Sequence, residues 1–181
     1  MDAKTLCLGA LALGEATGYE IRKLFEEGAF AHFHAASYGS IYPALNKLLD
    51  EGLVAVAEQP QEGRPDKKVY SLTESGHARF LDALMAPPAP DRIRSDVNFI
   101  LVFAPLLPRD RVVALIDGYL AALTELVAGI DAKPRAGFSP GRRFVMGFGR
   151  AIYQSAIDYL EANRHLVEAS AEGGGPAPTW E

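Results

Sequence analysis

The fold is decided by the stretch Ser37-Tyr-Gly-Ser-Ile-Tyr-Pro-Ala-Leu-Asn-Lys-Leu-Leu-Asp-Glu-Gly-Leu53. Its apolar residues recur at helical spacing and predict one buried stripe, made of Ile41, Leu45, Leu48 and Leu49. Ser37 or Ser40 can cap the start of this helix, and Gly52 suits the left-handed residue just past its end. The opposite face is small and polar, and it carries Gly39, Ser40, Pro43, Asn46 and Lys47. Such a face either enters a DNA major groove or is an ordinary solvated surface, and this helix alone leaves both interpretations open.

The segments on either side of this helix complete a small unit. Residues 4–13 read as a first, mostly apolar helix, and Thr17 and Glu20 form a capping box that begins a second one. Residues 53–58 and 67–72 alternate as strands around a turn that contains Pro and Gly. A fourth helix is expected from Thr73 to about Met85. Three helices followed by a two-stranded wing predict a winged helix-turn-helix over residues 1–86 of a mainly α chain.

Four linked motifs follow one another through this half of the chain. They are Thr17-Gly-Tyr-Glu-Ile21, Ser37-Tyr-Gly-Ser-Ile-Tyr-Pro-Ala-Leu45, the segment from Leu48 to Leu53, and Gly63-Arg-Pro followed by Lys68-Val-Tyr-Ser-Leu-Thr-Glu-Ser-Gly76. In this order and spacing they resemble the PadR family of bacterial transcriptional regulators. The resemblance implies a DNA-binding winged helix and a homodimer that reads a pseudo-palindromic operator, usually as a repressor. In length the chain resembles the subgroup with a virulence-activator-type helical C-terminal domain.

The resemblance also assigns DNA-binding positions. Those near DNA are Tyr19, Ser37, Tyr38, Ser40, Tyr42, Pro43 and Lys47, with Arg64, Lys67 and Lys68 on the wing. The family's wing tip is usually richer in Lys and Arg, whereas Glu62 and Asp66 are acidic here. We therefore expect weaker wing contacts than the family pattern implies.

The charge balance argues against strong DNA binding by one copy of the chain. The net charge is −5, and residues 1–82 carry eight Lys and Arg against twelve Asp and Glu (8 − 12 = −4). Phosphate contact depends on the local field more than on the sum, and Lys47, Arg64, Lys67 and Lys68 are placed to supply it. The acidity nevertheless motivates an alternative function, a winged-helix protein-interaction module without DNA binding.

The second half of the chain is predicted to be a helical dimerisation domain over residues 96–170. A Pro-rich connector, residues 87–95, precedes helices at about 96–104, 108–130 and 142–169, and residues 171–181 read as a disordered tail. The apolar arc of the last helix is wider than one packing partner needs, and it includes Phe144, Phe148, Ile152, Ala156, Tyr159 and Leu160. This helix is either the centre of a three-helix bundle or the contact with a second subunit, and the resemblance favours the second.

Other chemistry is sparse in the sequence. The single cysteine, Cys7, excludes an internal disulfide and fits a reducing, cytoplasmic compartment, and no uninterrupted apolar run approaches the ~20 residues of a membrane helix. His32 and His34 lack the spaced partners of a metal site, and no catalytic motif is found, so we expect neither an enzyme nor a cofactor. The resemblance, together with the aromatic residues Phe99, Phe103, Phe144, Phe148 and Tyr159, suggests a site for a small-molecule effector of unknown identity between the winged helix and the C-terminal helices, although plain core packing explains most of these residues.

Overall fold

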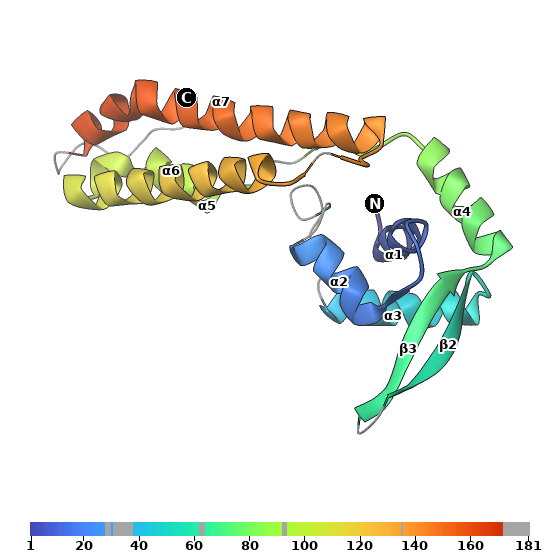
Figure 1. Cartoon of the computed structure of the whole chain (residues 1–181). Helices are drawn as coiled ribbons and strands as arrows, with labels where there is room; N and C mark the ends of the chain where they lie inside the picture. Colours follow the sequence, from blue (N-terminus) through green and yellow to red (C-terminus); the bar gives the residue numbers. More distant parts are fainter. Residues whose placement is uncertain (28–29, 31–37, 62–63, 92–93, 135, 172–181) are drawn as a thin grey trace. The chain divides into compact units, whose positions relative to one another are not determined.

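The computed structural model describes residues 1–27, 30, 38–61, 64–91, 94–134 and 136–171. Contacts divide the chain into two compact units, Met1–Asp91 and Arg92–Glu181, and each is considered by itself. The first contains, in order, α1 (Ala3–Leu11), β1 (Ala16–Thr17), α2 (Gly18–Glu26), α3 (Tyr38–Asp50), β2 (Val54–Gln61), β3 (Arg64–Leu72) and α4 (Glu74–Met85) (Figure 1).

Side-chain caps begin three helices of the first unit, α1, α2 and α4. The capping box expected at α2 is confirmed, because the Glu20 amide donates to Thr17 Oγ1 at 3.2 Å and the Thr17 amide donates to a Glu20 carboxylate oxygen at 2.8 Å. Asp2 caps α1 and Thr73 caps α4 in the same way. Gly52 has a φ of +68°, which confirms the left-handed residue predicted after α3.

The sheet has three antiparallel strands in the order β1-β3-β2, so the expectation of two strands missed one. β1 is only two residues long and pairs Thr17 with Val69, and no alternating pattern can be seen over so short a segment. The two wing strands are also longer than predicted. β2 continues through Pro60, where the register with β3 shifts, and reaches Gln61. Proline is tolerated there because β2 is an edge strand.

The core of the first unit lies between α3 and the elements around it. Ile41, Leu45 and Leu48 are fully buried, as the predicted stripe requires, and Leu49 is half-buried. Helices α1 and α2, β2 and Tyr70 of β3 supply the rest of this cluster. Burying three side chains of this size contributes roughly 2 kcal/mol each, which holds α3 in place while its other face stays in solvent.

The second unit is helical and contains α5 (Asp96–Val102), a 3₁₀ turn η1 (Ala104–Leu106), α6 (Arg109–Asp131) and α7 (Pro140–Ser170). α6 and α7 run side by side in opposite directions (Figure 1). Helix α5 ends earlier than predicted because the chain turns into η1 around Pro105. In α6 the buried residues include Val112, Ile116 and Leu123, and Val113 is half-buried.

Helix α6 is long and apolar enough to cross a membrane by length and composition, with a mean hydropathy of 1.7 over its most apolar window. The sequence expectation, which considered only uninterrupted apolar runs, missed this property. The helix carries Asp117 and Glu125 between its ends, and Asp117 forms a 2.8 Å ion pair with Arg164 of α7. Within the chain 17% of that window is buried, and the helix packs against α7.

Candidate nucleic-acid interface

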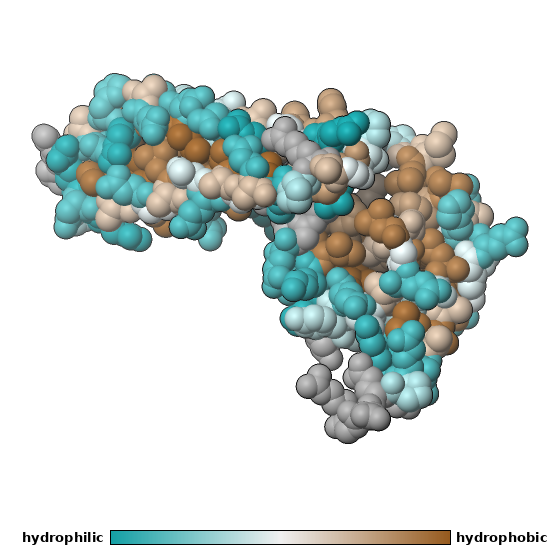
Figure 2. Space-filling model, in the orientation of Figure 1, coloured by the Kyte–Doolittle hydropathy of each residue, from teal (hydrophilic) through white to brown (hydrophobic). Residues whose placement is uncertain are grey.

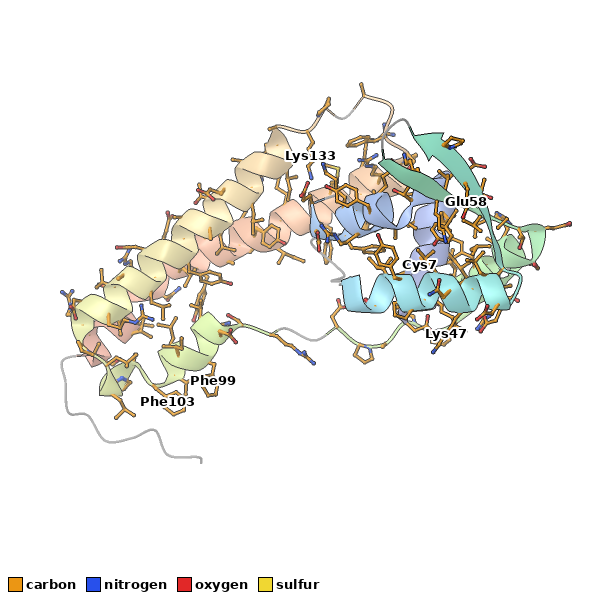
Figure 3. The ribbon with its side chains drawn as sticks, turned by 90° about the horizontal axis from the view of Figure 1, so that it is seen from below. Cys7, Lys47, Glu58, Phe99, Phe103 and Lys133 are labelled. Atoms are coloured by element: carbon orange, nitrogen blue, oxygen red, sulfur yellow. The ribbon has the colours of Figure 1, made fainter. Side chains whose placement is uncertain are left out.

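One face of α3 is exposed to solvent and carries small and polar residues. Pro43 and Lys47 are exposed on it, as are Gly39 and Asn46, and Ser40 is half-buried. Lys47 lies on the side of α3 that faces away from Cys7 and the core (Figure 3). Pro43 is inside the helix, where it removes one intrahelical hydrogen bond, and its exposed position leaves the freed carbonyl accessible to water.

A groove of about 580 Å³ runs between α3, the start of α2 and the wing. It brings together four of the predicted DNA-binding residues, Tyr19, Tyr42, Lys67 and Lys68, although they come from three separate elements. The other lining residues are Thr17, Gly18, Glu20, Asn46 and Tyr70. Hydroxyl, amide and ammonium groups therefore converge on one concave surface. Such a set suits the phosphates and groove edges of a duplex.

The other predicted residues lie on the opposite flank of α3, where Ser40, Pro43 and Lys47 are found, or outside the described residues. Tyr19 is 58% exposed, and its ring carries the Arg22 guanidinium at 5.4 Å from the ring centroid. Ser37 lies outside the described residues, and so do the side chains of Tyr38 and Arg64.

The lysines of the wing are paired with carboxylates. Lys67 Nζ lies 3.2 Å from a carboxylate oxygen of Glu20, and Lys68 Nζ lies 3.9 Å from one of Glu58. Glu20 was recognised from the sequence only as a helix cap. The signal that could have placed it in the groove is its position in the first turn of α2, next to the predicted Tyr19. Hydrogen bonds from the Thr17 amide and hydroxyl, and then Lys67, lower the pKa of Glu20, so the groove holds an anion as well as cations.

The other flank of α3 is more acidic. A second groove of about 650 Å³ runs past Ser40, Pro43 and Lys47, and its remaining lining residues are Asp2, Ala3, Lys4, Ala44, Asp50 and Glu51. Three carboxylates and two ammonium groups line this side. The electrostatic field across α3 is therefore asymmetric, and it favours approach of a polyanion from the wing side.

A second surface without a partner lies on α7. Large apolar side chains recur there at every seventh residue, and Val145, Ile152, Tyr159 and Leu166 are 42–66% exposed. Phe144 and Phe148 are also exposed beside this stripe. Apolar residues are visible on the surface of the helical unit (Figure 2). Ala156 and Leu160, predicted for the same surface, pack against the cluster of Leu123, Val127 and Ile157 within the chain.

The described residues include no group of three or more His, Cys, Asp or Glu side chains able to hold a metal ion. His32 and His34 lie outside the described part of the chain. Cys7 is 1% exposed and packs in the core of the first unit. Burial, and to a smaller extent Asp2, raises the pKa of its thiol to about 12.

Known proteins share this architecture. A family model described as the transcriptional regulator PadR-like family matches residues 7–82. The negative transcriptional regulator PadR of Bacillus subtilis is 33% identical over 177 residues, which cover 91% of this chain and 97% of that protein. Its crystal structure in complex with operator DNA matches with a TM-score of 0.77 at 27% identity, over 91% of this chain and 98% of that one.

Two further structures match most of the chain. The complex of Bacillus subtilis PadR with p-coumaric acid has a TM-score of 0.67 at 26% identity, and it covers 91% of this chain and 98% of that one. The virulence activator AphA of Vibrio cholerae, at 23% identity, shares the fold with a TM-score of 0.60 over 93% of this chain and 99% of its own. These matches extend over both units, so the helical part is matched as well as the winged helix.

Proposed function

The chain belongs to the PadR-like family of transcriptional regulators, and from this premise we propose that it represses transcription by binding a pseudo-palindromic DNA operator as a homodimer. The observation that carries the proposal is the groove in which Tyr19, Tyr42 and Lys68 meet beside the exposed face of α3. Repression is the function of the Bacillus subtilis relative, and its complex with operator DNA supports the same mode here. The family is one of DNA-binding proteins and not of enzymes. A cytoplasmic location follows from this function.

We propose that α3 reads sequence and the wing fixes register. Exposed Lys47 on α3 can reach a guanine edge or a phosphate, whereas Lys68 on β3 is placed for backbone phosphate alone. The small residues beside Lys47 allow the helix backbone to approach the base pairs closely. Ser40, Tyr42 and Pro43 would lie against the wall of the same DNA groove as Lys47. The roles of Ser37, Tyr38 and Arg64 stay predictions from the family pattern.

The exposed stripe on α7 supports the homodimer. Residues at every seventh position lie along one side of a helix, as in helices that pack against a partner helix over their whole length. An uncovered apolar surface of this extent is unusual on a monomer. Phe144, Phe148, Ile152 and Tyr159 carry the proposed contact, with Val145 and Leu166 added to the residues predicted from sequence. Ala156 and Leu160 contribute mainly by packing α7 onto α6.

We further propose that a small aromatic effector tunes operator binding. Bacillus subtilis PadR has been crystallised with p-coumaric acid, a compound of this kind. A groove of about 320 Å³ between α5, α6 and α7 offers apolar walls from Leu101, Ile116 and Leu160 with the polar side chains of Asn98 and Tyr119, and its volume suits one aromatic ring with a short side chain. Arg164 also lines this groove, but it forms ion pairs with Asp117 and Glu168. The aromatic ring of the effector and its hydroxyl groups would therefore supply most of the contact.

The experiment that tests the proposal begins with selection of bound fragments from the source genome by the purified protein. A selected fragment is then titrated at low and moderate salt beside a scrambled duplex of equal length. We expect tighter binding to the selected fragment and a steep salt dependence for both duplexes. Equal affinity for both at every salt concentration would favour the interaction-module alternative, which the acidic balance of residues 1–82 motivates and no compared protein supports.

A panel of phenolic and planar compounds tests the effector. An effector should shift both the melting temperature and the operator affinity, since a ligand stabilises the state that binds it. Substitution Leu101→Trp, which fills the groove, should abolish both shifts and leave operator binding intact. If no compound in the panel changes either quantity, control by protein abundance replaces control by a ligand.

A further inference from the structure

On the wing, Lys67 forms an ion pair with Glu20, and hydrogen bonds from Thr17 hold the Glu20 carboxylate in place. The two-residue strand β1 pairs Thr17 with Val69, and this pairing sets the start of α2 beside Lys67, two residues earlier on β3. Lys67 Nζ then lies 3.2 Å from Glu20 Oε1. The sheet register, and not a chance surface encounter, brings the two charges together.

The Glu20 carboxylate has little freedom to move away. Its second oxygen, Oε2, accepts hydrogen bonds from both the amide and the hydroxyl of Thr17, each at 2.8 Å. The capping box thus anchors one side of the carboxylate, and Lys67 occupies the other. These contacts keep the pKa of Glu20 below its ordinary value, and the group stays charged at neutral pH.

The neighbouring pair on the wing lacks this anchoring. Lys68 and Glu58 face each other across β2 and β3, but their charged atoms are 3.9 Å apart and both side chains are 62% exposed. An exposed pair at that distance is screened by water and costs little to separate. Lys68 can therefore turn to a phosphate, whereas Lys67 would have to leave a fixed anion to do so.

We infer that Glu20 is a specificity-determining residue of the reading surface, because it withholds Lys67 from the DNA backbone; the inference rests on the proposed function. Backbone contacts strengthen binding to every sequence alike, whereas base contacts made from α3 strengthen binding to the operator only. A lysine neutralised by Glu20 adds little to the first class of contact. The ion pair thereby lowers affinity for random DNA and raises the ratio of operator to random binding.

The decisive variant is Glu20→Gln, which removes the charge and keeps the cap, since glutamine is accepted at the third position of a capping box. Lys67 is then free to bind phosphate. We expect tighter binding to scrambled DNA, a smaller ratio of operator to scrambled affinity, and a salt slope steeper by about one unit per half-site. One added contact should make the gain on scrambled DNA shrink about three- to four-fold between roughly 50 and 200 mM salt.

Two further substitutions make the test specific. Glu27→Gln removes a carboxylate that pairs with Lys23 at 3.5 Å outside both grooves, and it should leave the salt slope unchanged. Lys67→Gln should leave the slope unchanged in the parent protein, and should lower it by about one unit per half-site in the Glu20→Gln background. This dependence on background is the signature of a lysine that contacts phosphate only when Glu20 is neutral.

The outcomes separate this inference from the proposed function. If the parent protein distinguishes operator from scrambled DNA and Glu20→Gln alters neither the ratio nor the slope, the inference is wrong and the proposed function stands. If Lys67→Gln in the parent background lowers the salt slope of binding by about one unit per half-site, the inference about Glu20 is also wrong. This second test remains informative if the Glu20→Gln variant unfolds at too low a temperature to assay. If the parent binds both duplexes equally, the proposed function itself fails.

Discussion

A Cβ atom on Gly18 would lie 2.6 Å from Cε1 of Tyr42, so only glycine lets the Tyr42 ring lie against the start of α2. Real Cβ atoms essentially never approach another atom so closely. Gly18 belongs to the motif that begins α2, and Tyr42 to the motif that forms α3. The two motifs are therefore one structural device, in which α2 sets the position of an aromatic side chain in the candidate interface.

Replacing Gly18 with alanine should weaken DNA binding more than it destabilises the fold. The added methyl group pushes the Tyr42 ring outward, and overpacking of this kind costs about 1–3 kcal/mol of folding free energy. Operator affinity should fall further because the ring and hydroxyl of Tyr42 leave the groove. Thermal melts and binding titrations of the same sample separate the two effects.

Two companion variants check this reasoning. In Gly18→Ala/Tyr42→Ala the costs should not add, because removing the ring removes the clash. In Gly129→Ala, on α6, the new Cβ meets nothing within 4 Å, and stability should rise by about 0.5–1 kcal/mol through helix propensity. Full operator affinity in Gly18→Ala would show that the position of Tyr42 does not matter for binding.

Local patterns in the sequence were sufficient to predict the elements of the winged helix. Helical spacing identified the buried stripe of α3, and the pairing of Thr17 with Glu20 identified the start of α2. Each signal is carried by residues only a few positions apart in the sequence. It therefore depends on local backbone geometry, which is the same in every protein. The family resemblance assigned residues to the site, but it did not predict the concave surface on which four of them meet.

Features that depend on pairing between distant segments could not be predicted. Strand β1 is defined by its register with β3, and two residues carry no periodic signal. The ion pair between Lys67 and Glu20 follows from that register. The sequence placed Lys67 near DNA and did not indicate this carboxylate partner. In α7 the width of the apolar arc was visible in the sequence, but the division between residues that pack on α6 and residues left exposed required the structure.

Substituting Lys47 and Lys68 should distinguish base recognition from contact with backbone phosphate. Lys47→Ala is expected to cost roughly 1–3 kcal/mol on the operator and to relax preference at one position per half-site if this residue reads a base. Lys68→Ala should weaken binding to operator and scrambled DNA alike and lower the salt slope by about one unit per half-site. A salt series of dissociation constants on both duplexes measures these effects. If both variants bind the two duplexes as the parent does, α3 and the wing are not the elements that contact DNA.

Replacing Ile152 with glutamate should dissociate the proposed dimer. Ile152 is half exposed in one chain and lies in the middle of the α7 stripe, so a charge there would be buried without a partner in the dimer. Light scattering should give about twice the 19.5 kDa chain mass for the parent and a single chain mass for the variant. His165→Glu, exposed on α7 outside the stripe, is the matched control and should remain dimeric. A monomeric parent at micromolar concentration would contradict the proposal.

Acid should destabilise the first unit through Asp2 and Glu20. Hydrogen bonds from the Thr5 amide and hydroxyl lower the pKa of Asp2, and those from Thr17 lower the pKa of Glu20. For both groups the unfolded chain binds protons at a higher pH than the folded chain does, so stability is full above about pH 5 and is lost as pH falls through the folded pKa values. Urea titrations between about pH 3 and 7 should show a shallower loss in Asp2→Asn and Glu20→Gln than in the parent. An unchanged slope in both variants would assign the acid sensitivity to other carboxylates.

The Cys7 thiol should be unreactive in the folded protein and reactive once the first unit opens. The side chain is 1% exposed, and burial raises its pKa to about 12, so both access and thiolate fraction are low at pH 8. Alkylation of the native protein should therefore follow the opening of the cluster that contains Ile41 and Leu45, and should accelerate in denaturant to the rate of a free thiol. Leu45→Ala, which removes a fully buried side chain at a cost of about 2–5 kcal/mol, should speed native alkylation by at least ten-fold. Because α3 is part of this cluster, bound operator should slow the reaction in proportion to its affinity. Alkylation of the native parent at the rate of a free thiol would mean that Cys7 is accessible, and that the core between α1 and α3 is open in solution.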